Sequence, residues 1–250
     1  KIPYFIHESD IEMGLSNKYA AKGALKVFVG FPVDNYKGNN NLEYSGQIIK
    51  DTKSNKKDNF FDFLEKKTTI FITGGSQGSL NINKNVVKIV ANLLKSYNII
   101  HQTGQNDFEW VKEYRDKLNE NLKYNYYITD MLGREETDMV LEAIEISDLV
   151  ISRAGANTIA EIAINKKAMI LIPYKHAAGN HQNKNAEFMF SNKGALIIKD
   201  DELSPDMLRE KINEALANKE NLGINAYQML KKDGLKTITD EIIHQINSKD

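Results

Sequence analysis

Residues 69–79 read TIFITGGSQGS, a short apolar run that leads directly into a glycine-rich turn. An apolar run without alternation is typical of a strand buried on both faces, as in parallel sheets. The adjacent glycines allow the backbone to turn sharply and to approach a ligand closely. Helical periodicity follows over residues 80–95. We therefore predict a strand–turn–helix unit of a parallel α/β sheet.

The alternation of apolar runs and helical stretches continues through the rest of the chain. Further strands are predicted at residues 4–7, 26–31, 97–100, 124–128, 148–151, 168–172 and 195–198. Helices are predicted at residues 14–24, 107–118, 137–146, 158–165, 181–192 and 204–217, with one or two more over 221–248. Strands that are each followed by a helix predict a doubly wound parallel sheet, in which ligands bind beyond the carboxyl ends of the strands.

Composition narrows the class of protein. The 250 residues are 41% hydrophobic and 27% charged with a net charge of -1, so we expect a soluble globular protein and no nucleic-acid partner. The absence of cysteine excludes disulfides and thiolate metal sites and favours a reducing compartment. No apolar run reaches the roughly eighteen residues that span a bilayer, and no signal peptide opens the chain. The polar segment 51–58, DTKSNKKD, predicts an exposed connection near a domain boundary.

Two loops after predicted strands resemble phosphate-binding turns. In residues 74–79 the N–H groups of the helix start and the Ser76 hydroxyl can hold a phosphate. The Gly-Gly-x-x-Gly spacing differs from the dinucleotide fingerprint, and no Walker-type lysine follows. In residues 152–161 Gly155 precedes a second helix start, and the Glu161 carboxylate can accept hydrogen bonds from ribose hydroxyls. The alternatives are a tight strand–helix turn and a carboxylate that caps its helix.

A third polar loop, residues 176–185 (HAAGNHQNKN), leads into a helix on the same rim. His181, Gln182 and Asn185 offer donors and acceptors that suit sugar hydroxyls, although an ordinary exposed loop is the alternative. His101, in the HQTGQN stretch on this rim, is interpreted as a structural histidine.

Near the N-terminus, HESD at residues 7–10 places an imidazole and a carboxylate after a strand. His7 and Glu8 are therefore candidates for acid–base work. The simpler interpretation is helix capping by Ser16 or Asn17, with His7 in a hydrogen-bonded network.

Together these stretches resemble the MurG-type family of bacterial N-acetylglucosaminyltransferases, which converts lipid I to lipid II. The family pattern contains His-Glu…Gly-Leu-x-Asn-Lys, Gly-Gly-Ser-Gln-Gly, His-Gln-x-Gly, Ala-Gly-Ala-x-Thr-x-x-Glu and Gln…Asn-Ala segments. They occur here in the same order at residues 7–18, 74–78, 101–104, 154–161 and 182–186. The resemblance extends over nearly the whole chain.

The resemblance implies an α/β glycosyltransferase fold of the B type, with two Rossmann-like domains that each contain a parallel sheet. It implies a remnant of an N-terminal acceptor and membrane domain at 1–55, a C-terminal UDP-sugar-binding domain at 56–230, and a C-terminal helix at 231–250 that can pack back on the N-terminal domain. The family's Gly-Gly-Thr-Gly-Gly-His loop, which carries the general base, has no counterpart here. We therefore expect an incomplete N-terminal domain.

The resemblance also implies which residues bind UDP-GlcNAc. The backbone of Ile128 meets uracil, Glu161 the ribose, and Ser76 the diphosphate. The full set is Asp10, Lys50, Gly75, Ser76, Gln77, Ile128, Ala156, Asn157, Thr158, Glu161, His181 and Gln182.

Three members of this set depart from the family pattern. His181 stands where the family often has glutamine. Lys50 replaces an arginine, which keeps the positive charge but loses the planar fork of the guanidinium. Asp10 replaces an asparagine, and a carboxylate near a sugar diphosphate would repel it.

The implied activity is inverting transfer of N-acetylglucosamine from UDP-GlcNAc to an undecaprenyl-linked muramyl-pentapeptide, in peptidoglycan synthesis. The implied location is the cytoplasmic face of the bacterial cell membrane, with peripheral attachment. No Asp-x-Asp pair is present, so we expect no metal and no cofactor. The helix starts would stabilise the charge that grows on the leaving UDP. Three alternatives stay open: a UDP-GlcNAc 2-epimerase-like enzyme, a non-catalytic or partner-dependent UDP-sugar-binding subunit, and a dinucleotide-dependent oxidoreductase, against which the glycine spacing argues.

Overall fold

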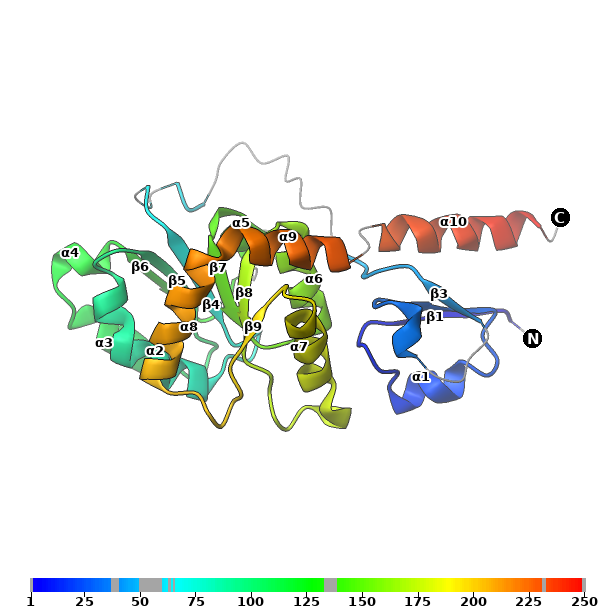
Figure 1. The fold of residues 1–250 in the computed structure, drawn as a ribbon, viewed down its shortest axis with the longest axis horizontal. Coiled ribbons are helices and arrows are strands. Elements are labelled where there is room, and N and C mark those ends of the chain that lie inside the picture. The colour runs from blue at the N-terminus through cyan, green and yellow to red at the C-terminus, as the bar shows by residue number, and fades with distance from the viewer. Residues whose placement is uncertain are drawn as a thin grey trace.

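The computed structural model describes residues 2–36, 41–49, 60–62, 64, 66–132, 139–230 and 233–248. In this part of the chain the strands form two parallel sheets, one of three strands near the N-terminus and one of six strands (Figure 1). The smaller sheet and the helix at the C-terminus lie side by side at one end of the molecule, and the larger sheet with its helices forms the other end.

The smaller sheet has the order β1-β2-β3, formed by β1 (Phe5–Glu8), β2 (Lys26–Val29) and β3 (Leu42–Tyr44). The helix α1 (Leu15–Ala20) connects β1 to β2, and the short 3-10 helix η1 (Val33–Asn35) precedes β3. The two strands and the helix predicted here are therefore present: β1 is shifted by one residue from its predicted position, and α1 and β2 are shorter than predicted. The strand β3 was not predicted.

The larger sheet contains all six strands predicted after residue 68, with ends shifted by no more than two residues. These are β4 (Thr69–Thr73), β5 (Asn98–Gln102), β6 (Tyr126–Thr129), β7 (Leu149–Ser152), β8 (Ala168–Leu171) and β9 (Leu196–Ile197). All neighbours are parallel and the order is β6-β5-β4-β7-β8-β9. This is the doubly wound arrangement, whose strand order reverses between the first and the fourth strand, here β4 and β7.

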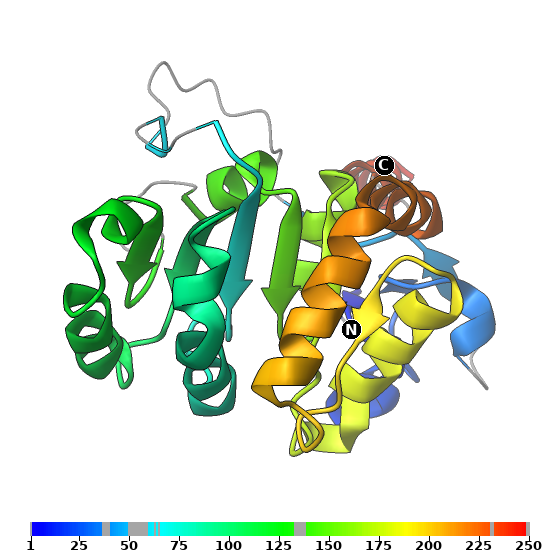
Figure 2. The ribbon, with the colours of Figure 1, turned by 60° about the vertical axis from the view of Figure 1, so that its left-hand side comes forward.

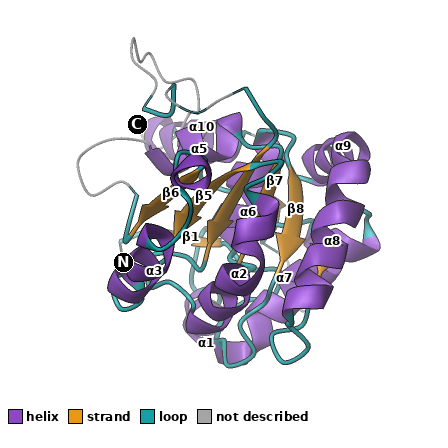
Figure 3. Cartoon of the chain, turned by 90° about the vertical axis from the view of Figure 1, so that its left-hand side faces the viewer, coloured by secondary structure: helices purple, strands orange, loops and turns teal. Residues whose placement is uncertain are grey.

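Helices cover both faces of the larger sheet (Figures 2 and 3). Their bounds are α2 (Leu80–Leu93), α3 (Phe108–Asp116), α4 (Glu120–Lys123), α5 (Met139–Ile146), α6 (Ala156–Ile164), the 3-10 helix η2 (Ala178–Asn180), α7 (His181–Ser191), α8 (Pro205–Ala217), α9 (Lys219–Met229) and α10 (Gly234–Asn247). In Figure 2 the teal α2 and the orange α8 lie on the same side of the sheet. The single-turn helix α4 was not predicted.

Two apolar cores follow from the alternation of side chains along the strands. In β4, Ile70 and Ile72 belong to the core that α2, α3 and α8 cover, whereas Phe71 belongs to the core beneath α5, α6 and α7. The second core continues into the N-terminal part, where the rings of Phe31 and Phe188 meet edge-on with centroids 5.3 Å apart. The two sheets are therefore joined by apolar packing.

The last helix, α10, lies alongside β3 in Figure 1. The Lys26 ammonium on β2 is 2.9 Å from a carboxylate oxygen of Glu43 on β3 and 2.9 Å from one of Glu241 on α10. Gly234, the first residue of α10, approaches so closely that a Cβ there would lie 2.2 Å from the carbonyl oxygen of Gln47. An ion pair and a close backbone contact thus attach α10 to the N-terminal part.

Candidate functional site

The candidate site lies where the strand order reverses. Thr73 at the end of β4 pairs with Ser152 at the end of β7, so the loops that follow both strands start at the same level of one sheet edge. Crevices outside the carboxyl ends of such strands are the usual ligand sites of doubly wound sheets. The prediction that the loops at 74–78 and 155–158 share an edge is confirmed.

Two cavities adjoin at this edge. The first has a volume of about 640 Å³ and is lined by residues 73–81 and by Ser152, Arg153, Gly155, Thr158, Tyr174, Gln182 and Asp200. The second, of about 490 Å³, is lined by Ser9, Asp10, Gly155, Ala156, Asn157, Thr158, Tyr174, Ala177, His181 and Gln182. Four residues line both cavities, so one elongated ligand can contact the glycine-rich loop, the start of α6 and the start of α7.

The glycine-rich loop is held open by its own backbone. Gly75 has a φ of +83°, and its N–H donates to the Thr73 hydroxyl over 3.0 Å. The amide of Gln102 on β5 donates to the Gly75 carbonyl over 3.0 Å. The side chains of Ser76 and Gln77 are exposed and line the first cavity. The loop thus presents the predicted phosphate-binding residues to the cavity.

The helix that follows this loop starts where the sequence predicted, but a side chain caps its beginning. The helix α2 starts at Leu80, several residues after Ser76, and its N-cap residue Ser79 accepts a hydrogen bond from the N–H of Ile82 over 3.4 Å. The beginning of α2 is therefore partly closed by its own serine. Sequence periodicity alone cannot tell which serine of a loop becomes the cap.

The beginning of α6 is different. Its N-cap is Gly155, and no side chain caps it. The first N–H groups of a helix lack intrahelical partners and carry the positive end of the helix dipole. Because Thr158 and Gly155 line both cavities, this helix start faces the ligand space, where it can hold an anion.

The two residues implied for the nucleoside lie outside both cavities. Glu161 is the sixth residue of α6, too far along for the capping alternative, and burial raises the pKa of its carboxyl group. Ile128 lies in the edge strand β6, where it pairs with His101 of β5. Their roles toward uridine stay predictions.

The second cavity gathers the residues implied for the sugar. The Gln182 side-chain oxygen accepts from the backbone N–H of Tyr174 over 2.9 Å. His181 begins α7, and its Nδ1 atom is buried without a hydrogen-bond partner in the described structure. The Asp10 carboxylate accepts from the Asn185 amide over 2.8 Å, which turns one oxygen toward the protein. Lys50 lies outside the described residues.

The acid–base candidates near the N-terminus carry structural bonds. One oxygen of Glu8 accepts from the N–H of Asp10 over 3.0 Å, and the other accepts from Gly14 N–H and the Asn17 amide, each over 2.9 Å. His7 Nε2 lies 3.0 Å from the Gly46 carbonyl oxygen. The N-cap of α1 is Gly14 without a side-chain cap, so the expected capping by Ser16 or Asn17 is wrong.

The interpretation of His101 as structural agrees with its surroundings. It is fully buried, with Nδ1 2.9 Å from the Tyr126 hydroxyl and Nε2 2.9 Å from the Asn83 side-chain oxygen. Burial lowers the pKa of His101 to about 3, so the ring is neutral at physiological pH. Asn83 also donates to the Thr103 carbonyl over 2.8 Å, which links this network to the loop beneath the glycine-rich turn.

The residues of the first cavity that sequence reasoning missed include Arg153, Tyr174 and Asp200. Arg153 directly precedes the Ala-Gly-Ala loop, and this position was the available signal. In the described ranges, no group of three or more His, Asp or Glu side chains is placed to hold a metal ion.

Comparison with solved structures identifies the class of fold. MurG from Acinetobacter baumannii superposes with a TM-score of 0.74 over 97% of this chain and 68% of that protein, at 22% sequence identity. The fold is therefore that of the B-type glycosyltransferases, and the predicted fold class is confirmed.

Residues 69–244 match the glycosyltransferase family 28 C-terminal domain, and the chain belongs to this family. A relative from Thermodesulfovibrio yellowstonii is 39% identical over 225 residues, covering 86% of this chain. A relative from Clostridium perfringens is 35% identical over 249 residues, covering 97% of it. Both are named as the N-acetylglucosamine transferase that acts on N-acetylmuramyl-(pentapeptide) pyrophosphoryl-undecaprenol, which confirms the MurG-type resemblance. The chain spans 59% and 66% of their lengths.

Proposed function

We propose that this chain binds UDP-N-acetylglucosamine and takes part in the transfer of its sugar, with inversion, to an undecaprenyl-linked muramyl-pentapeptide. The proposal rests above all on one observation: the uncapped start of α6 and the glycine-rich loop line one cavity at the switch point between β4 and β7. The names of the relatives favour this transfer over an epimerase or an oxidoreductase.

In this proposal the diphosphate lies where the two cavities meet. The N–H groups at the start of α6 and the Ser76 hydroxyl donate to its oxygens, and Gly75 and Gln77 flank it. The sugar extends into the second cavity, where Gln182 already uses its oxygen to accept from Tyr174 and keeps its amide nitrogen for a ligand.

The chemical step is a direct displacement. The acceptor hydroxyl gives its proton to a general base and attacks the anomeric carbon, the bond to the diphosphate oxygen breaks, and UDP leaves with the bonding electrons. Because negative charge grows on the diphosphate in the transition state, fixed N–H dipoles at the start of α6 lower the barrier. The described residues supply this electrostatic part of the reaction.

The lipid-linked acceptor requires contact with a membrane, and we propose peripheral attachment at the cytoplasmic face. Among the residues that the structure describes, no helix is long and apolar enough to cross a bilayer. Ser9 and Asp10 of the N-terminal part line the second cavity, so we propose this part as the acceptor side. We likewise propose that the chain divides into an N-terminal part, a UDP-sugar-binding domain and a C-terminal helix, with the limits 1–55, 56–230 and 231–250.

The decisive experiment is calorimetric titration of the chain with UDP-GlcNAc, UDP-GalNAc and NADH. UDP-GlcNAc is expected to bind, and NADH is not. Ser76→Ala removes one charge-assisted hydrogen bond, worth about 2 kcal/mol, and should weaken UDP-GlcNAc binding by roughly tenfold or more. Ser191→Ala, at the exposed far end of α7, is the matched control and should bind like the wild type.

A second titration separates the sugar from the nucleotide. Gln182→Ala should weaken UDP-GlcNAc binding while UDP alone binds nearly as before, since the substituted amide faces the sugar. Binding of NADH by the wild type, or unchanged UDP-GlcNAc binding by Ser76→Ala, would argue against the proposed site.

A further inference from the structure

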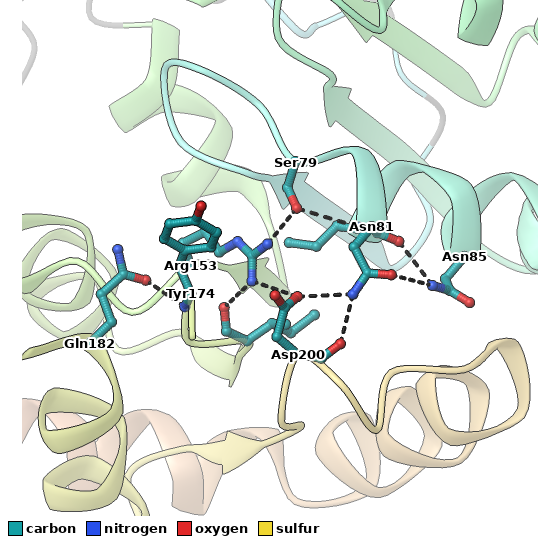
Figure 4. Close-up of polar contacts among 9 residues, drawn as sticks. Ser79, Asn81, Asn85, Arg153, Tyr174, Gln182 and Asp200 are labelled. Carbon is teal, nitrogen blue, oxygen red and sulfur yellow. Dashed lines mark hydrogen bonds and ion pairs between the residues drawn. The ribbon is translucent and has the colours of Figure 1, made fainter. Parts of the chain in front are cut away.

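Arg153 makes a set of contacts that the binding of a diphosphate does not by itself explain (Figure 4). One terminal nitrogen of its guanidinium donates to the Ser79 hydroxyl over 2.7 Å. The other donates to the Asp200 carboxylate over 2.9 Å and to the Ile172 carbonyl over 3.1 Å. The Arg153 side chain thus connects the segments that follow four neighbouring strands, β4, β7, β8 and β9.

The acidic partner of Arg153 is itself fixed. The Asn81 amide donates to the Asp200 carbonyl over 2.7 Å and to its carboxylate over 2.9 Å. Asn85, one turn further along α2, donates to the Asn81 carbonyl over 2.9 Å. The side chains of Arg153 and Asp200 are only 12% and 10% exposed, so their charges cancel inside a hydrogen-bonded network rather than in solvent.

The network connects the two loops that would hold the diphosphate. Ser79 ends the glycine-rich loop, whereas the backbone of Arg153 leads directly into Gly155 and the start of α6. The guanidinium also lies 5.3 Å from the centre of the Tyr174 ring, and the Tyr174 N–H donates to Gln182. The distance between the loops, and the placement of Gln182, therefore depend on this side chain.

We propose that Arg153 is a positioning residue that sets the spacing between the two phosphate-binding loops. This inference rests on the proposed function and deepens it. A diphosphate must contact the Ser76 loop and the start of α6 at once, and displacements of about 1 Å in such sites cost roughly a hundredfold in rate. Lysine cannot replace the guanidinium, because it offers one point charge instead of a planar fork with several fixed donors.

The test compares UDP, whose two phosphates span both loops, with UMP, whose single phosphate needs only one. In Arg153→Lys the affinity for UDP should fall at least tenfold and that for UMP less than threefold. Ser79→Ala is a smaller change that removes the same link and should shift the UDP-to-UMP affinity ratio in the same direction. A general loss of stability would weaken both ligands equally and leave the ratio unchanged.

Asp200→Ala separates positioning from direct phosphate binding. If the guanidinium bound the phosphate itself, releasing it from Asp200 would strengthen UDP binding. Positioning predicts that UDP binding weakens in Asp200→Ala, as in Arg153→Lys. Arg209→Lys is the matched control, because Arg209 makes an exposed ion pair with Asp206 on α8 and should leave the ratio unchanged.

The outcomes distinguish this inference from the function on which it rests. If the wild type does not bind UDP, the proposed function fails and the positioning role falls with it. If the wild type binds UDP but Arg153→Lys and Ser79→Ala keep the wild-type ratio, only the positioning role is refuted. Stronger UDP binding by Asp200→Ala would likewise overturn it in favour of a direct contact. Circular dichroism and thermal unfolding establish that each variant is folded at the assay temperature.

Discussion

Two glycines of the same loop offer a matched test of how the site is built. Gly75 and Gly78 both have positive φ angles, +83° and +74°. A Cβ at Gly75 would meet nothing within 4 Å, whereas one at Gly78 would lie 2.1 Å from the Thr103 carbonyl oxygen and 2.8 Å from the Cα of Gly104. Alanine at either position has the same backbone strain, but only Gly78→Ala also forces two loops apart.

The magnitudes follow from these distances. A left-handed conformation costs a non-glycine residue about 1–2 kcal/mol, which is the whole expected cost of Gly75→Ala. Gly78→Ala adds a steric overlap that backbone must relieve, typically about 1–3 kcal/mol. We expect Gly78→Ala to lower the free energy of unfolding by about 4 kcal/mol and Gly75→Ala by about 1 kcal/mol. For a chain of this size, the difference corresponds to a melting temperature gap of roughly 6–12 °C.

Thermal unfolding of the two variants beside the wild type, followed by circular dichroism, measures this gap. Gly104→Ala provides a second check, since its Cβ would lie 2.5 Å from the Gln77 carbonyl oxygen across the same contact. It should therefore behave like Gly78→Ala. Equal melting temperatures for Gly75→Ala and Gly78→Ala would refute the close approach of the two loops and leave the φ angles as the whole explanation.

Three further predictions concern buried polar groups. Burial lowers the pKa of His101 to about 3 from the ordinary value of 6.5. Between these two pH values the His101 ring binds a proton only in the unfolded chain, so the free energy of unfolding rises with pH in this range. Unfolding in denaturant should show the wild type losing about 2 kcal/mol relative to His101→Gln between pH 8 and pH 5, and the same pH dependence in both proteins would contradict this reasoning. Burial raises the pKa of the Glu161 carboxyl group, so its ionised form opposes folding. Glu161→Gln should therefore have a higher melting temperature at pH 8, yet bind UDP at least tenfold more weakly. A variant that lost stability but kept UDP binding would support a structural role instead. Asn185 is fully buried and bonds to Asp10, Ile11 and the Ala154 carbonyl, so Asn185→Ala should cost about 2–3 kcal/mol in chemical unfolding, while Asn192→Ala should cost under 1 kcal/mol. Equal costs for these two asparagines would contradict the bridging role.

The larger sheet could be predicted from sequence because its strands are buried on both faces. Such strands require near-continuous apolar runs, and β4, β7 and β8 are fully buried along their lengths. The loops after β4 and β7 were found because glycine residues mark the turn between each buried strand and the following helix. Local pattern and global fold agree here.

Elements that lack such a pattern were missed. The strand β3 has three residues, all half-buried, with Glu43 in the middle, so it has no apolar run to detect. The helix α4 is a single turn that begins at Glu120 and shifts the start of β6 two residues beyond its predicted position. Tertiary contacts, rather than local propensity, decide elements this short.

Residues that act through distant partners were also beyond prediction. Asn185 was proposed as a sugar ligand, yet its amide bridges the Asp10 loop and the Ala154 carbonyl. Arg153 and Asp200 are 47 positions apart in sequence, and nothing in either local pattern indicates their ion pair. Only the fold shows that the segments after β7 and β9, which flank β8, meet at one edge of the sheet.

The two helices that begin at the switch point, α2 and α6, differ in how their N-termini are capped. The start of α2 is capped by Ser79, and the Ser79 hydroxyl also accepts a hydrogen bond from Arg153. This hydroxyl is therefore already used in hydrogen bonds within the protein. The N-cap of α6 is Gly155, and no side chain caps this helix, so no capping side chain occupies its first N–H groups. A glycine N-cap is less stabilising than serine by a few tenths of a kcal/mol, a small cost at a place where a side-chain oxygen would compete with phosphate. We therefore propose that the start of α6 binds the anion, and that the glycine-rich loop contributes through Ser76 and its backbone rather than through the dipole of α2.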